Sequence, residues 1–113
     1  MKVLVVEDDA LVGLDLAEIL CDLGHEVIGP FASVAAALVH CEVGRIDLGL
    51  LDFNLGGETS ASVADTLTSR GLPFAFVTGY RCESLPERFR ETPVVSKPVS
   101  PPALVRVIDK IAG

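Results

Sequence analysis

The chain has little positive charge and few aromatic residues, with no tryptophan and a single tyrosine. Lysine and arginine number 9 against 16 aspartates and glutamates, so the formal net charge of its 113 residues is −7. This balance disfavours binding to nucleic acid or to an anionic membrane surface, because both require a basic face. We therefore expect its partners to be proteins, cations or small anions.

Cysteine is also scarce. The three cysteines, Cys21, Cys41 and Cys82, are an odd number without a Cys-x-x-Cys pair, which predicts reduced intracellular thiols rather than disulfides or a zinc site. The N-terminus lacks the apolar core of a signal peptide. The longest stretch without Lys, Arg, Asp or Glu, residues 27–41, is shorter than the ~20 apolar residues of a membrane span. These absences predict a cytoplasmic protein without membrane attachment.

Half of the residues are hydrophobic, which is typical of a folded domain and excludes a disordered acidic tail. A chain of this length buries roughly two-thirds of its unfolded surface, so one self-sufficient core is feasible. We expect residues 1–113 to form a single domain with no effector domain attached.

Five short apolar runs recur along the chain, and they are continuous or nearly so rather than alternating. They span residues 3–6, 26–28, 47–51, 74–77 and 94–95. Continuous runs are typical of parallel strands that are buried on both faces. The runs therefore predict a parallel sheet covered by helices on both sides.

Helical patterns separate these runs. Apolar positions spaced for a helix, with Ser, Pro or Gly at the ends, occupy residues 12–23, 33–43, 58–70 and 101 to the chain end. Residues 78–92 contain Gly, Pro and clustered charges, and leave room only for a short helix near 85–90. Alternation of this kind predicts a doubly wound, three-layer α/β/α sheet, whose sites lie beyond the carboxyl ends of its strands.

Acidic residues follow two of the predicted strands at that edge. Glu7, Asp8 and Asp9 come after the first run, and Asp52 follows the third. Two carboxylates about 4 Å apart repel by roughly 4 kcal/mol at an effective dielectric near 20, so the cluster requires a cation. Oxygen ligands without His or Cys favour a hard ion, Mg²⁺ or Mn²⁺, which would let a phosphoryl group approach.

Residue types then suggest roles. Asp52 ends an apolar strand and is placed to act as a nucleophile towards phosphorus. Lys97 offers a cation, and Thr78 a hydroxyl, to phosphoryl oxygens. Asn54 lies in a loop where its backbone carbonyl could complete the metal shell. Each residue also has an ordinary structural interpretation, as a helix cap, turn former or loop residue; their joint occurrence at strand ends favours a site.

The chain resembles a response-regulator receiver domain of the CheY-like superfamily over essentially its whole length. The motifs that carry the resemblance are Val-Val-Glu-Asp-Asp (5–9), Leu-Leu-Asp-Phe-Asn (50–54), Val-Thr-Gly (77–79) and Ser-Lys-Pro (96–98). The resemblance implies a (βα)₅ fold of flavodoxin-like strand order 2-1-3-4-5. It also implies phosphotransfer from a histidine kinase to Asp52.

The same resemblance implies finer assignments. Asp8 would be a direct metal ligand and Glu7 would act through water, with Asp9 outside the first coordination shell. The Lys97–Pro98 peptide bond would be cis.

A longer motif, Pro-Phe-Ala-Phe-Val-Thr-Gly-Tyr (73–80), is similar to the Pro-Phe-x-Phe-Ala-Thr-Gly-Tyr receivers of alphaproteobacteria, which are linked to kinases of the HWE class. One departure from ordinary receivers is Val94, where they carry an aromatic switch residue. We hypothesise that Tyr80 or the 78–92 segment takes over the readout, although Tyr80 is equally explained as a packed loop aromatic. Asn54 and Tyr80 would also tune the lifetime of the acyl phosphate.

The sequence thus predicts a signalling switch rather than an enzyme, acting through protein partners as a monomer or as a weak phosphorylation-dependent dimer. A phosphate sink, a phosphorelay shuttle and a fragment of a sigma-factor-like stress-response regulator remain alternatives. An aspartate-nucleophile phosphatase would need Asp-x-Asp, where this chain has Asp52-Phe53-Asn54. A flavin site would be repelled by the acids after the first strand, and a scaffold would not need the complete set of site residues.

Overall fold

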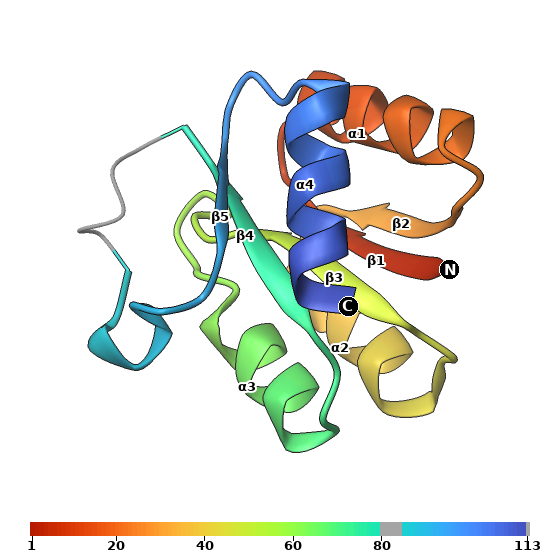
Figure 1. Cartoon of the computed structure of the whole chain (residues 1–113). Helices are drawn as coiled ribbons and strands as arrows, with labels where there is room; N and C mark the ends of the chain where they lie inside the picture. The colour runs from red at the N-terminus through yellow and green to blue at the C-terminus, as the bar shows by residue number, and fades with distance from the viewer. Residues whose placement is uncertain (80–84, 113) are drawn as a thin grey trace.

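The computed structural model describes residues 1–79 and 85–112, apart from the side chains of residues 42 and 43 (Figure 1). The strands are β1 (Lys2–Val6), β2 (Glu26–Phe31), β3 (Leu48–Asp52), β4 (Phe74–Thr78) and β5 (Val94–Ser96). They pair in parallel in the order β2-β1-β3-β4-β5, which confirms the predicted doubly wound sheet.

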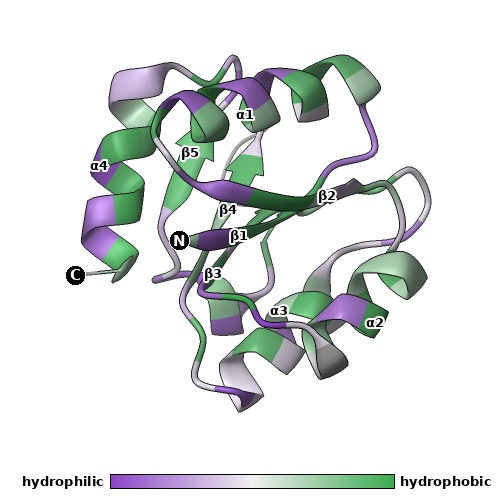
Figure 2. Cartoon of the chain, turned by 90° about the vertical axis from the view of Figure 1, so that its right-hand side faces the viewer, coloured by the Kyte–Doolittle hydropathy of each residue, from purple (hydrophilic) through white to green (hydrophobic). Residues whose placement is uncertain are grey.

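In the part of the chain that the structure describes, four α-helices and one 3-10 turn follow the strands. They are α1 (Ala10–Asp22), α2 (Val34–Val43), α3 (Ala61–Ser69), η2 (Glu87–Phe89) and α4 (Pro101–Ala112). Helices α1 and α4 cover one face of the sheet, and α2 and α3 cover the other (Figures 1 and 2). No helix in the described part of the chain is long and apolar enough to cross a membrane.

The strands explain the continuous apolar runs. In β1, Leu4 and Val6 pack in the core beneath α2 and α3, whereas Val3 and Val5 pack in the core beneath α1 and α4. All four side chains are fully buried. Because alternate residues of a strand point to opposite faces, a strand covered on both sides must be apolar at every position.

Short polar side chains start three of the helices, and two of them are the serines that the sequence indicates. Asp9 accepts hydrogen bonds from the amides of Leu11 and Val12 and begins α1, two residues before the predicted start. Ser33 accepts from the Ala36 amide at the start of α2, and Ser100 begins α4 in the same way. Asp9 is thus occupied as a helix cap.

The two largest errors in the predicted boundaries were three residues each. The helix expected over 58–70 begins at Ala61, because the preceding residues close a turn in which the Leu55 amide donates to the Glu58 carbonyl. Strand β2 continues past residue 28 to Phe31, through a cis Gly29–Pro30 bond. Gly29 has φ +113°, and a Cβ there would lie 2.7 Å from the Val5 carbonyl oxygen, so only glycine fits. The Lys97–Pro98 bond is also cis, as predicted.

The connection from β4 to β5 contains, within its described residues, a single 3-10 turn rather than an α-helix. The turn η2 follows Pro86, whose extended backbone (ψ 151°) precedes it. The Phe89 side chain anchors the turn, because it is 4% exposed and its ring contacts that of Phe76 with centroids 5.3 Å apart. The short helix expected near 85–90 is therefore present as a single 3-10 turn over Glu87–Phe89.

Helix α2 is held at both ends by residues that flank α3. The Glu58 carboxylate accepts a hydrogen bond from the Val34 amide at 3.2 Å. Arg70 donates to the carbonyl oxygens of Cys41 and Gly44 at the other end. An acid at the N-terminus and a base at the C-terminus both complement the helix dipole. We call this arrangement the α2 clamp.

Candidate functional site

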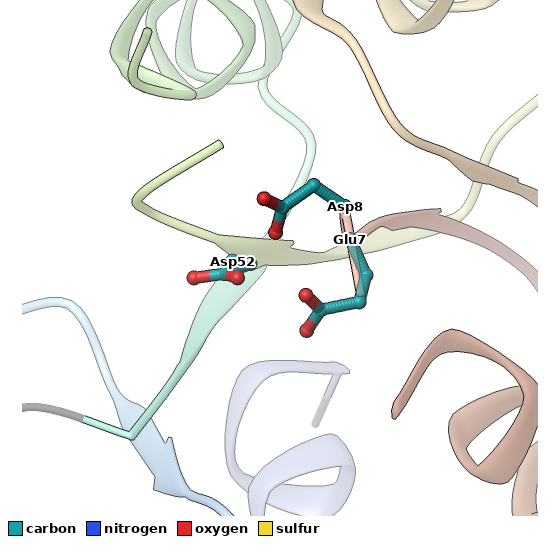
Figure 3. A group of neighbouring side chains, drawn as sticks. All are labelled: Glu7, Asp8 and Asp52. Atoms are coloured by element: carbon teal, nitrogen blue, oxygen red, sulfur yellow. The ribbon is translucent and has the colours of Figure 1, made fainter. Parts of the chain in front are cut away.

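Three carboxylates meet at the carboxyl edge of the sheet (Figure 3). Glu7 and Asp8 follow β1, and Asp52 ends β3; one oxygen from each lies within 4.8 Å of the others. Glu7 and Asp52 are only 3% and 6% exposed, whereas Asp8 is open to solvent. The structure thus brings together the acids that the sequence places at neighbouring strand ends.

Lys97 neutralises two of these acids. It follows β5, and its Nζ lies 2.7 Å from Glu7 Oε1 and 3.0 Å from Asp52 Oδ2. The other Asp52 oxygen accepts a hydrogen bond from the Asn54 amide at 3.3 Å. The strand-end rule placed Lys97 at the same edge as Glu7 and Asp52 but did not predict which carboxylates its ammonium contacts.

The ionisation of this group reflects both burial and pairing. Burial raises the pKa of Glu7 to about 7, which Asp52 reinforces and the Lys97 hydrogen bond opposes. Burial acts to lower the pKa of Lys97, but its hydrogen bonds with Glu7 and Asp52 outweigh burial and raise that pKa. The ammonium is therefore held in its charged form between the two carboxyl groups.

Without divalent cations, we expect the stability contributed by Glu7 to fall as the pH rises from 4.5 towards 7. The folded protein binds this proton more tightly than the unfolded chain, whose carboxyl has the ordinary pKa of 4.5. The stabilisation is therefore complete below pH 4.5 and is lost as the pH passes about 7, a change on the order of 3 kcal/mol. Chemical denaturation in a chelator, at acidic and mildly basic pH, measures it.

The matched control for this prediction is Glu7→Gln, which removes the titrating group. Other ionisable groups contribute to both proteins, so the difference between wild type and Glu7→Gln isolates Glu7. We expect the free energy of unfolding of the wild type to fall relative to that of Glu7→Gln as the pH rises. A difference that stays constant with pH would contradict the assigned ionisation.

A hollow of about 510 Å³ opens beside these side chains. Asp8, Asp52, Asn54 and Lys97 line it together with glycines. One of these is Gly56, with φ +61°, where a Cβ would lie 3.4 Å from an Asp8 carboxylate oxygen. The glycine therefore keeps the loop after β3 close to the acids without filling the hollow.

The remaining predicted site residues lie at the same edge or outside the described residues. Thr78 ends β4, is 4% exposed, and its carbonyl accepts from the Lys97 amide at 3.0 Å. Asn54 is exposed and pairs with Thr59 in an antiparallel bridge. Tyr80 and Cys82 fall outside the described residues.

The donor set fits a hard divalent cation. All three side chains offer carboxylate oxygens, and the group contains no histidine nitrogen or cysteine sulfur. Mg²⁺ prefers one or two carboxylates and retains waters, which the exposed Asp8 and the adjoining hollow would accommodate. The cluster could therefore hold a metal ion.

Comparison with known proteins identifies the family. No family model matches the chain. The solution structure of SdrG from Sphingomonas melonis Fr1 is 38% identical to it, with a TM-score of 0.88, over 96% of this chain and 93% of that one. A CheY-like receiver domain protein from Methanospirillum hungatei JF-1 is 25% identical with a TM-score of 0.82, over 96% of this chain and 90% of that one. The chain belongs to the response-regulator receiver domains.

A further relative of this receiver domain is the regulator PhyR from Methylorubrum extorquens. It is 32% identical over an alignment of 118 positions, which covers 96% of this chain and 42% of PhyR. The chain spans about half the length of the curated relatives it matches. Membership in this family indicates a signalling role for the chain.

Proposed function

We propose that this receiver domain accepts a phosphoryl group on Asp52 from a histidine kinase and thereby changes its affinity for a protein partner. The observation that carries the proposal is the position of Asp52. It ends a buried strand, opens on the hollow, and has one oxygen fixed by the Asn54 amide and the other by Lys97. A solved structure of the similar protein SdrG is described as a BeF3-activated conformation, which supports the same chemistry here.

The transfer is a displacement at phosphorus. An oxygen of Asp52 forms a bond to the phosphorus of phosphohistidine while the phosphorus–nitrogen bond breaks. The imidazole nitrogen leaves with the electron pair and takes up a proton, and the product is an acyl phosphate on Asp52. With this proton the atoms and charges of the transfer balance.

The residues around Asp52 have distinct parts in this reaction. The Lys97 ammonium, now paired with the Asp52 carboxylate, can transfer its hydrogen bond to a phosphoryl oxygen as that carboxylate is esterified. The Thr78 hydroxyl would donate to a second phosphoryl oxygen. Both interactions strengthen as negative charge develops on the phosphoryl group, which is the condition for accelerating the transfer.

Asp8, Asp52 and the Asn54 backbone carbonyl would hold Mg²⁺ or Mn²⁺, with Glu7 acting through water. When bound, the cation supplies positive charge that offsets the repulsion between these acids and an incoming phosphoryl group. The buried Glu7 carboxyl, whose Oε1 lies 2.7 Å from the Lys97 ammonium, keeps that ammonium close to Asp52.

The finer features of the pathway follow from the sequence motifs. The 73–80 motif favours a kinase of the HWE class, whereas the cytoplasmic location is inferred from the cysteine pattern and the N-terminal sequence. Strand β5 carries Val94 opposite Phe76 where other receivers have an aromatic side chain, so Tyr80 is our candidate for the readout. A stand-alone switch, a phosphate sink, a relay shuttle and part of a stress-response regulator would all use the same reaction.

The experiment that tests this proposal is site-specific detection of the acyl phosphate. Purified protein is incubated with a small phosphodonor, with Mg²⁺ or with chelator, and intact and peptide masses are measured. We expect a hydroxylamine-sensitive adduct that requires Mg²⁺ and maps to the peptide containing Asp52. An adduct elsewhere, or none with any donor including phosphorylated histidine kinases, would overturn the proposal.

A further inference from the structure

Arg88 joins the turn η2 to helix α3. Its Nε donates to Asp65 Oδ1 at 3.1 Å and its Nη2 to Asp65 Oδ2 at 3.0 Å, the parallel fork that arginine makes with a carboxylate. The same guanidinium lies 4.5 Å from the centroid of the Phe89 ring. These contacts fix one side chain by a bidentate ion pair and by a cation–π interaction.

Most exposed ion pairs stabilise a fold little, because two flexible side chains must be ordered in water. The Arg88–Asp65 pair differs in geometry, although both side chains are about half exposed. The aromatic ring beneath the guanidinium limits its motion, and its planar fork matches the carboxylate. The pair also bridges two separate elements, so its loss frees one from the other.

The turn held in this way is connected to the phosphorylation site through packed rings. Phe89 contacts Phe76 of β4 at a centroid distance of 5.3 Å, and Phe76 contacts Phe53 at 5.6 Å. Phe53 directly follows Asp52, and Phe76 lies two residues before Thr78 on the same face of β4. The turn and the site therefore share one aromatic cluster.

We propose that the Arg88–Asp65 pair is a latch that fixes η2 against α3 and opposes the rearrangement that follows phosphorylation of Asp52. The inference rests on the proposed function. It adds that two of the chain's own residues, Arg88 and Asp65, regulate the response to phosphorylation. When Thr78 moves towards a phosphoryl group, the shift of β4 reaches η2 through Phe76, whose ring packs against that of Phe89. Releasing η2 costs the latch contacts, so the latch lowers the affinity of the site for a phosphoryl group or its analogue.

The latch also addresses the missing aromatic on β5. With Val94 in that strand, no aromatic ring in β5 can change position on activation. Among the described residues between β4 and β5, Phe89 is the buried ring, and the latch residue Arg88 lies over it. A movement of η2 therefore also moves the buried Phe89 ring. Breaking the Arg88–Asp65 pair at the surface would thus change the packing of the core.

A double-mutant cycle tests the proposal. Asp65→Asn, Arg88→Gln and the double variant are titrated with beryllofluoride in Mg²⁺, and binding is followed at the Thr78 amide by NMR. We expect each single variant to bind about three-fold to five-fold more tightly than wild type. The double variant should bind no more tightly than Arg88→Gln, because each of the three variants removes the same ion pair.

The matched control is Arg90→Gln. Arg90 pairs with Glu87 at 3.2 Å within the same turn and does not reach α3, so this variant removes one arginine pair without releasing η2. Its beryllofluoride affinity should equal that of wild type. Should a latch variant fold poorly, Arg88→Lys keeps the charge, loses the fork, and is expected to give an intermediate affinity.

A second readout needs no ligand. Amide exchange at Phe89 and Thr92, whose amides donate within the turn to Pro86 and Phe89, should be faster in the latch variants of the metal-free protein. The latch would be overturned if the single variants bound beryllofluoride with wild-type affinity, or if their effects on affinity multiplied in the double variant. An equal gain in affinity for Arg90→Gln would overturn it as well. If wild type binds no beryllofluoride at all, the proposed function itself fails and the latch with it.

Discussion

Replacing Asp52 by asparagine is expected to abolish phosphoryl acceptance while leaving the fold intact. An amide has nearly the shape of a carboxylate and retains an oxygen for the Asn54 amide, but it is not a competent nucleophile towards phosphorus. Loss of one charge also relieves the crowding of acids around Glu7. Intact mass after incubation with a phosphodonor should show no adduct, with an unaltered circular dichroism spectrum.

The control for Asp52 is an acid that lies next to the cluster without belonging to it. Asp9 is exposed and caps α1 by accepting from the Leu11 and Val12 amides, a role that asparagine fills equally well. Asp9→Asn should therefore take up the phosphoryl group as wild type does. If Asp52→Asn still formed a hydroxylamine-sensitive adduct, the nucleophile would have to be a different carboxylate.

The second large effect is expected at Lys97. Replacing it by methionine keeps an apolar stem of similar length and removes the ammonium that contacts both Glu7 and Asp52. We expect the rate of phosphoryl acceptance to fall by about 100-fold or more, the usual cost of removing one preorganised donor to developing negative charge. Quantifying the adduct against time in saturating Mg²⁺ measures this loss.

Lys110→Met provides the same change in charge on α4, away from the cluster. Its rate should match that of wild type, which separates the local contact from a change in net charge. A second consequence is specific to Lys97: since its hydrogen bond lowers the pKa of Glu7, the methionine variant should protonate Glu7 at a higher pH. Equal rates for Lys97→Met and wild type would show that the ammonium does not contact the reacting phosphoryl group.

Much of the fold could be predicted because its determinants are local. The continuous apolar runs located strands β1, β3 and β4, and the serines Ser33 and Ser100 marked two helix starts. The strand order came from the resemblance to receivers, whose motifs lie at strand ends. The acids at the site could be placed for the same reason, because parallel strands deliver their carboxyl ends to one edge.

The features that escaped prediction depend on side chains that meet across elements. Arg88 and Asp65 lie 23 residues apart, and Glu58 and Val34 lie 24 apart. Pairs at such separations have no periodicity to indicate them. The reduction of the expected helix near 85–90 to η2 was likewise hidden, because burial of Phe89 rather than helix propensity decides where the turn forms.

The α2 clamp has a consequence for how this domain opens. Glu58 and Arg70 lie on either side of α3, yet they hold the two ends of α2. Helix α2 thus cannot detach without breaking contacts from both flanks of α3. The two helices constitute a single cooperative unit of local unfolding, so their slowest-exchanging amides share one opening free energy.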